Sequence, residues 1–225
     1  MALILNIDTA VEAASICLAK NGGILTVAKN VHKDSPGQKD HAQWLHVAIK
    51  EIFEKNNLEI GSIDAVAVTG GPGSYTGLRI GMASAKGICY GLDKPLITIN
   101  TLLVMANAAK SNETGLLCPM IDARRMEVFT AIYTSDLEPV KGAAAMTLNE
   151  KSFDEELSVN PIIFFGNGSN KFSRIKNHAN AFFKEKYFDA TAMVTLAEQQ
   201  FNKKEFADLA YAEPLYLKEF YTVAR

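Results

Sequence analysis

The sequence predicts an α/β fold of two lobes, in which mixed β-sheets are flanked by helices. Short apolar segments joined by hairpin turn residues open the chain, amphipathic helices alternate with further strands, and a second such set follows residue 101. A chain of 225 residues can form two lobes of about 100 residues each. We expect residues 1–101 to form the first lobe and residues 102–225 the second, with a cleft between them and a tail that can pack back on the first.

The first lobe is expected to contain its elements in the order βββαβα, followed by one more strand. Asn21-Gly22-Gly23 tolerates the positive φ angles of a hairpin turn, so the chain opens with an antiparallel meander. Asp40 is a candidate N-cap for the first helix, in which Leu45 and Ile49 recur at helical spacing. The predicted segments are 3–7, 14–19, 23–31, 40–57, 63–69, 76–90 and 96–99.

The second lobe has weaker patterns. Residues 134–160 are acidic and show little periodicity, so no strand or helix stands out there. A turn at 166–170 precedes a helix, and residues 214–217 form an extended segment that packs on the body. The other predicted segments are helices at 102–109 and 193–201 and strands at 116–121, 126–133 and 161–165.

The composition excludes several classes of protein. With 48% hydrophobic and 21% charged residues, the chain is not disordered. The net charge is −2 and neither half is basic, which argues against a stand-alone nucleic-acid binder. Three widely separated cysteines favour a reducing cytoplasm. The N-terminus lacks a positive region and no apolar run approaches 18 residues, so we predict neither a signal peptide nor a membrane span.

A glycine-rich turn at 70–77 separates a buried strand from a helix, an arrangement that can aim backbone N–H groups at a phosphate. The turn matches neither common phosphate-binding pattern. Leu78 follows Gly77 where the Walker pattern needs lysine, and the dinucleotide pattern would need one residue fewer. Two interpretations therefore stay open, a phosphate loop and a tight connection that needs positive φ angles.

The longer string GGPGSYTGLRIGMASAKGICYG at 70–91 resembles a signature of the TsaB (YeaZ) family, relatives of the TsaD glycoprotease-like proteins. The resemblance covers nearly the whole chain, because LILNIDTA at 3–10, IDARRMEVF at 121–129 and EPLYLK at 213–218 also match. It implies an actin-like, ribonuclease H-like fold of the actin–hexokinase–Hsp70 superfamily. The second lobe would then be a diverged copy of the first.

The resemblance also bears on metal binding. TsaD relatives hold a metal with a His-x-x-x-His pair on the first helix, whereas His41 and His46 lie five positions apart here. That spacing places them about 140° apart around a helix, so they cannot bind one metal together. Leu45 occupies the position of the second ligand. We predict no metal, no cofactor and no catalytic residue.

A degenerate nucleotide cleft is the second feature that the resemblance implies. No glycine follows Asp8-Thr9, and residues 166–170 read Gly-Asn-Gly-Ser-Asn where relatives have a Gly-Gly turn. Weak nucleotide binding and ordinary capped turns are both open interpretations. The candidate residues are Asp8, Thr9, Gly71, Gly73, Ser74, Gly166 and Gly168.

Two helix faces of the first lobe are candidates for a partner interface. The first helix has a widened apolar arc, and Gly77, Gly81 and Ala85 recur every four residues as a smooth stripe. Alternatively, both faces pack on the chain's own sheet. The candidate interface residues are His41, Trp44, Leu45, Val47, Ala48, Gly77, Gly81, Met82, Ala85 and Ile88.

The resemblance implies a non-catalytic subunit that binds and activates the TsaD catalytic subunit. The reaction would be threonylcarbamoyl transfer to the adenosine next to the anticodon of tRNA, with TsaE as the ATPase and tRNA contacted indirectly. Alone, the chain is expected to form a homodimer. The alternatives are an active metal-dependent glycoprotease-like hydrolase and a nucleotide-dependent phosphotransferase. Candidates for a minor RNA contact, which solvated surface charge would also explain, are Arg124, Arg125, Lys171, Arg174 and Lys176.

Overall fold

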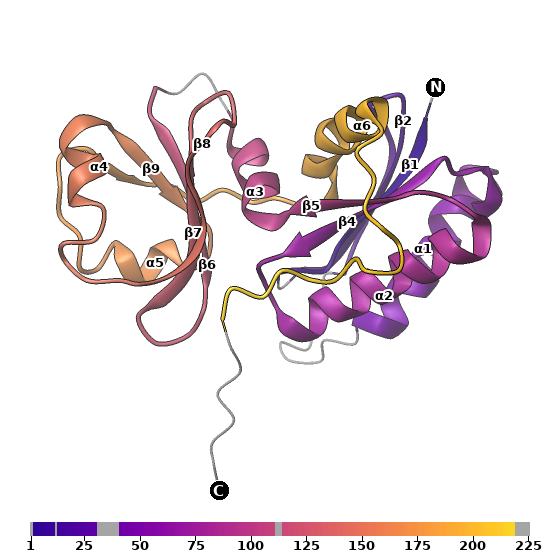
Figure 1. The fold of residues 1–225 in the computed structure, drawn as a ribbon, viewed down its shortest axis with the longest axis horizontal. Coiled ribbons are helices and arrows are strands. Elements are labelled where there is room, and N and C mark those ends of the chain that lie inside the picture. The colour runs from indigo at the N-terminus through magenta and orange to yellow at the C-terminus, as the bar shows by residue number, and fades with distance from the viewer. Residues whose placement is uncertain (1, 12, 31–40, 111–113, 219–225) are drawn as a thin grey trace, which may run out of the picture. The chain divides into compact units, whose positions relative to one another are not determined.

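The computed structural model describes residues 2–11, 13–30, 41–110 and 114–218, and Figure 1 shows its ribbon. The chain divides into two compact units. Unit 1 comprises Met1–Val104 and Phe188–Pro214, and unit 2 comprises Met105–Tyr187 and Leu215–Arg225. The α/β class with two mixed, helix-flanked sheets is confirmed.

Unit 1 is built on a five-stranded sheet with the order β3-β2-β1-β4-β5. The first three strands pair antiparallel, as the hairpin residues predicted, whereas β4 pairs parallel with both β1 and β5. The strands are β1 (Leu3–Asp8), β2 (Ser15–Lys20), β3 (Gly23–Lys29), β4 (Ala65–Gly71) and β5 (Leu96–Asn100).

Helices cover both faces of this sheet (Figure 1). α1 (His41–Lys55) and α2 (Tyr75–Leu92) share one apolar core with the strands, and α6 (Val194–Lys203) packs on the opposite face against β1 and β5. All three helices were predicted within a few residues of these bounds. The proposed N-cap Asp40 lies outside the described residues.

Unit 2 repeats the topology of unit 1. Its sheet has the order β10-β9-β6-β7-β8, with β6, β7 and β8 antiparallel and β9 parallel to both β6 and β10. This matching order supports the expectation of a duplicated βββαβα unit. The elements are β6 (Leu116–Asp122), β7 (Glu127–Tyr133), β8 (Pro139–Thr147), α4 (Asp154–Val159), β9 (Ile162–Phe165), α5 (Ser169–Phe172) and β10 (Ala181–Phe183).

Strand β8 lies in the stretch where the sequence showed no element. Its sequence PVKGAAAMT contains small residues without alternation, and nearly all of its residues are exposed or half-buried. An edge strand that is exposed to solvent on both faces does not need alternating apolar and polar residues, and strand prediction depends on that alternation. The strand exists because β7 pairs with it from Glu127 to Tyr133, a long-range contact that local patterns cannot report.

Residues 188–214 return to unit 1 after unit 2 is complete. The turn η2 (Ala190–Met193) docks on β2, where the Ala190 N–H donates to Ser15 Oγ at 2.9 Å. Lys29 of β3 forms an ion pair with Asp189 at 2.5 Å. The division predicted at residue 101 assigned this segment, including the helix at 193–201, to the second lobe and let only the tail pack back. That assignment is corrected, because residues 188–214 with α6 belong to unit 1. Within the described residues, no helix has the length and apolarity that a membrane crossing requires.

Candidate functional site

Asp8 ends β1 inside the core of unit 1 and is fully buried. Its Oδ1 accepts hydrogen bonds from Thr69 Oγ1 at 2.9 Å and from the Ala10 N–H at 3.0 Å. Its Oδ2 has no hydrogen-bond partner among the described residues. Burial is the main reason that the pKa of this carboxyl rises to about 6, and the charge of Asp189 adds to the effect.

The glycine-rich turn and the start of α2 pack directly against the residues that follow Asp8. A Cβ at Gly73 would lie 2.4 Å from Ala10 O, and one at Gly77 would lie 2.0 Å from Thr9 O. A Cβ at Gly81 would lie 2.2 Å from Thr9 Oγ1. The glycines are therefore needed because the chain's own β1–β2 connection approaches the helix at backbone distance.

This contact corrects the prediction that the stripe of Gly77, Gly81 and Ala85 faces a partner. All three residues are buried, and the surface that they form is occupied by Thr9 and the sheet. The same correction applies to Leu45, Ala48 and Met82, which lie in the hydrophobic core of unit 1. The alternative that these faces pack on the chain's own sheet holds for these residues.

The other nucleotide candidates are divided between two turns. In unit 1, Gly71 is buried, whereas Ser74 is exposed and caps α2 by accepting a hydrogen bond from the Gly77 N–H. In unit 2, a Cβ at Gly166 would lie 2.4 Å from Met120 O, and one at Gly168 would lie 2.8 Å from Val128 Cγ1. Both glycine turns thus serve close packing within their own unit, and their role toward a nucleotide stays a prediction.

The neighbouring residues Leu45 and His46 of α1 lie in different surroundings. His46 is exposed, and its Nε2 lies 3.4 Å from Ser84 Oγ on α2. Leu45 is fully buried in the core. The side chain of His41 lies outside the described part of the chain. Among the described residues, no three His, Cys, Asp or Glu side chains gather in a way that could hold a metal ion.

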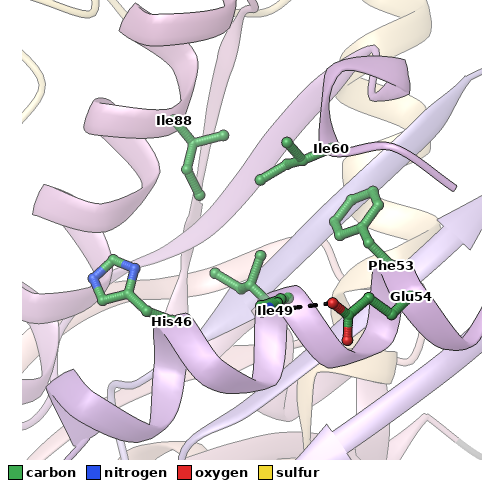
Figure 2. Close-up of a pocket in the computed structure, with 7 residues that line it drawn as sticks. His46, Ile49, Phe53, Glu54, Ile60 and Ile88 are labelled. Carbon is green, nitrogen blue, oxygen red and sulfur yellow. Dashed lines mark ion pairs between the residues drawn. The ribbon is translucent and has the colours of Figure 1, made fainter.

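An apolar groove of about 310 Å³ lies between α1, α2 and the short turn η1 (Ile60–Ser62). Figure 2 shows Ile49 and Phe53 of α1 on one side, with Ile60 and Ile88 opposite them. At its rim, Lys50 and Glu54 form an ion pair at 3.7 Å. The sequence analysis did not predict this groove. One of its walls, η1, belongs to the connection between α1 and β4, and the helical spacing of apolar residues does not show where a groove remains between two packed helices.

Three predicted interface residues of α1 and α2 remain at least partly accessible. Val47 is 52% exposed on α1, next to the groove residue His46. Ile88 lines the groove from α2, and Trp44 packs half-buried against the core. A partner could therefore contact α1 and α2 through residues at their exposed edges.

The candidate RNA-contacting residues also separate into two groups. The Lys176 side chain is 3% exposed and forms an ion pair with Asp154. Lys171 Nζ binds Asp122 Oδ1 at 3.0 Å. Both lysines are thus held by their own unit, whereas Arg124, Arg125 and Arg174 are exposed. The last three stay candidates for contact with a polyanion.

The fold and these contacts define a class: a two-unit α/β protein of duplicated topology, with tightly packed glycine turns and an apolar groove on unit 1. Comparison with known proteins gives the family. The family model described as "TsaD: tRNA N6-adenosine threonylcarbamoyltransferase" matches residues 27–219. The chain therefore belongs to this family, in its TsaB (YeaZ) branch, as the relatives described next indicate.

Several relatives are named "tRNA threonylcarbamoyladenosine biosynthesis protein TsaB". The one from Escherichia coli is 36% identical over 134 residues, which cover 59% of this chain and 55% of that protein. The one from Buchnera aphidicola (subspecies Baizongia pistaciae) is 29% identical over 177 residues, covering 76% and 77%. The matched region spans about half the length of the relatives from Escherichia coli and Haemophilus influenzae.

A solved structure titled "YeaZ from Pseudomonas aeruginosa" has the same fold. It superimposes with a TM-score of 0.79 at 23% identity, covering 96% of this chain and all of that one. At this identity the likeness supports the fold alone. The resemblance that the sequence motifs indicated is confirmed.

Proposed function

We propose that this chain is a non-catalytic subunit in the biosynthesis of tRNA threonylcarbamoyladenosine and that it acts by binding and activating a TsaD-type transferase. The observation that carries the proposal is its membership of a family branch whose curated relatives bear the TsaB name. In this role the chain would work in the cytoplasm, with the TsaE ATPase and tRNA as further components of the assembly.

The residues of unit 1 support a structural role rather than a chemical one. Leu45 is an apolar core residue at the position where the catalytic relatives would need a second metal-ligating histidine. Asp8, the only acid of β1, is enclosed by Thr69 and Ala10. A subunit built this way can influence its partner through the shape and stability of a contact, without supplying reacting groups.

The groove between α1 and α2 is the surface that we assign to TsaD. Ile60 and Ile88 offer accessible apolar area at its walls, and burying such area gains about 25 cal/mol per Å². Two helices of the partner packed on α1 and α2 would make a four-helix contact, with one of them lying along the groove. Standard specific interfaces bury about 1,600 Å² in total, so the contact must extend beyond the groove to exposed neighbours such as Val47.

The same surface would be uncovered when TsaD is absent. We therefore propose that the isolated chain forms a homodimer through α1 and α2 and that TsaD competes with this dimer. Light scattering on the purified chain should give the mass of a dimer at high concentration, and adding TsaD should convert it to a heteromeric species. A chain that stays monomeric at high concentration would contradict this arrangement.

Add-back to a depleted extract tests the proposed function. An extract from cells depleted of this chain should not form threonylcarbamoyladenosine in tRNA, as measured by mass spectrometry of digested tRNA. Adding the purified chain should restore the modification, and the chain without TsaD should form none. Full modification in the depleted extract, or product formed by the chain alone, would refute the proposal.

Matched variants test the assigned surface. Val47→Glu places a charge on the proposed interface, and Val159→Glu places the same charge on an exposed valine of α4 in unit 2. We expect Val47→Glu and Ile60→Glu to abolish co-purification with TsaD, whereas Val159→Glu retains it. Gly81→Arg cannot serve as a test, because even a Cβ at Gly81 would overlap Thr9. Normal binding of TsaD by a folded Val47→Glu, Ile60→Glu double variant would place the interface elsewhere.

Independent hydrolase or phosphotransferase activity is the competing proposal. It requires a metal or a tightly bound nucleotide. Metal analysis of the purified chain and calorimetry with ATP distinguish the two proposals, because stoichiometric zinc or iron, or tight ATP binding, would favour the enzyme.

A further inference from the structure

The turn between β6 and β7 places two arginines in an unusual backbone conformation. Arg124 has a φ of +68° and Arg125 a φ of +48°, and both residues are exposed. The turn is closed by the Glu127 N–H, which donates to Arg124 O at 3.0 Å. Left-handed backbone is unfavourable for a residue with a Cβ, so glycine and asparagine are the usual choices. The arginines are thus present despite the backbone preference of the turn.

Both carboxylates beside this turn are already neutralised by lysines from other segments. Asp122 forms an ion pair with Lys171 of α5, with 3.0 Å between Oδ1 and Nζ. Glu127 forms an ion pair with Lys218 of the C-terminal segment. Each local acid therefore has its own cation. The charges of the two arginines remain unbalanced by these acids.

No hydrogen bond or ion pair from any described residue engages the guanidinium groups of Arg124 and Arg125. Their backbone, in contrast, is held firmly. Asp122 Oδ1 accepts from the Arg124 N–H at 2.6 Å, and Lys171 Nζ donates to Arg125 O at 2.8 Å. Lys171 Nζ also donates to Glu127 O at 2.7 Å. The structure thus fixes the turn and leaves both charged side chains to solvent.

We propose that the turn of Arg124 and Arg125 binds phosphate groups of the tRNA backbone directly. Guanidinium groups are suited to this role, because their planar donors form bidentate hydrogen bonds with phosphate oxygens. A pre-organised pair of side chains loses little backbone freedom on binding. The inference rests on the proposed function, which supplies tRNA as the substrate, and it adds a contact from unit 2 that the expected indirect role of tRNA did not include.

An RNA backbone fits this turn better than an acidic protein surface does. Two guanidinium groups project from it, and the one large apolar residue of the turn, Met126, is 36% exposed. Protein interfaces depend on a buried apolar centre, whereas phosphate contacts need only accessible donors. Because the net charge of the chain is −2, its overall charge does not attract a polyanion, and binding to one depends on a local cationic site such as this turn.

The test compares two double variants with the same change in net charge. Arg124→Asn with Arg125→Gly removes both guanidinium groups and installs the residues that the turn backbone prefers. Lys203→Gln with Lys204→Asn is the matched control, because both lysines are exposed in unit 1 and Lys204 also has a positive φ of 57°. Binding of an unmodified tRNA transcript to each full-length chain in complex with TsaD is measured by fluorescence anisotropy over a series of salt concentrations.

We expect the arginine variant to bind tRNA about tenfold more weakly or worse at low salt. Its slope of log K against log salt should be smaller by about 1.4–1.8, since each lost phosphate contact contributes about 0.7–0.9. Its melting temperature should equal or exceed that of the wild type, because the strained residues are gone. The lysine variant should match the wild type. Replacing both arginines by lysine should preserve the salt slope while lowering affinity.

Three results would overturn the inference. The first is an arginine variant with wild-type affinity and salt slope. The second is an equal loss in the lysine variant, which would indicate a general charge effect. The third is an arginine variant that no longer binds TsaD. In that case the weaker binding of tRNA would follow from the loss of the complex, and the turn would be a contact with the protein. If the wild-type chain restores modification in the depleted extract while any of these results holds, only this inference fails and the proposed function stands.

Discussion

The side-chain hydroxyl of Thr9 donates a hydrogen bond to the backbone carbonyl oxygen of Gly77 at 2.7 Å. This bond joins the end of the first strand to the first turn of α2, 68 positions later in the chain. The Ser74 N–H completes the junction by donating to Ala10 O at 2.7 Å. In a phosphate-binding loop such donors would face a ligand, whereas here they bind the chain itself.

The first prediction follows from this close approach. Gly77→Ala would place a Cβ 2.0 Å from Thr9 O, and the backbone must move to admit it. We expect a loss of about 1–3 kcal/mol or more in the free energy of unfolding, measured by urea denaturation. Gly87→Ala on the same helix is the matched control, since nothing lies within 4 Å of its Cβ. It should stabilise the protein by about 0.5–1 kcal/mol. Equal effects at both positions would show that packing against Thr9 is unimportant.

Asp8 gives a prediction about pH. Its pKa of about 6 in the folded protein exceeds the ordinary value of 3.8, so the folded state holds its proton more tightly than the unfolded state does. The favourable contribution of protonated Asp8 is complete below about pH 4 and is lost as the pH rises through 6. Relative to the wild type, Asp8→Asn should therefore gain up to ~3 kcal/mol between pH 4 and pH 7.5.

Denaturation of both proteins across this pH range measures that gain. Glu138→Gln, which changes an exposed carboxylate, is the control and should follow the wild type. The difference between pH values is the relevant quantity, because any fixed cost of placing an amide at Asp8 cancels. A constant difference between Asp8→Asn and the wild type would mean that Asp8 ionises as an ordinary carboxyl group.

Most of the fold was predictable because its signals are local. Asn21-Gly22-Gly23 marks the first hairpin, and the apolar residues of α1 recur at helical spacing. Strand β8 was not predictable, because its existence depends on pairing with β7 rather than on its own pattern. The return of residues 188–214 to unit 1 was also hidden, since contacts such as that between Ala190 and Ser15 span 175 positions.

The candidate site was predicted less well, for a physical reason. A small residue on a helix indicates a close approach but does not identify what approaches, and Gly81 accommodates Thr9 rather than a partner. Likewise, charge alone does not distinguish the internally paired Lys176 from the exposed Arg124. Accessibility depends on which long-range contacts form, and local patterns of residues do not show those contacts.

The cysteines give a third prediction. Cys17, Cys89 and Cys118 are free and buried. Burial raises the pKa of Cys17 and Cys118 to about 12 and that of Cys89 to about 11. Because the thiolate is the reactive form, the folded protein should resist alkylation at pH 7.5. Mass spectrometry should find almost no adduct after iodoacetamide treatment of the native chain and three adducts after denaturation. Rapid labelling of any one cysteine under native conditions would reveal local opening around it.

The last prediction concerns the segment that follows α6. Lys86 of α2 donates from Nζ to Ala212 O at 2.9 Å and to Ala210 O at 3.2 Å, and the segment also pairs with β5 through Ala207 and Leu96. Lys86→Met keeps the apolar stem of the side chain but removes both hydrogen bonds. Hydrogen exchange of the backbone amides of residues 208–213 should then become about tenfold faster, as expected for the loss of about 1.4 kcal/mol of local stability. Lys20→Met, at an exposed strand end, should leave that exchange unchanged. Unaltered exchange in Lys86→Met would mean that the pairing of Ala207 with Leu96 suffices to hold the segment on unit 1.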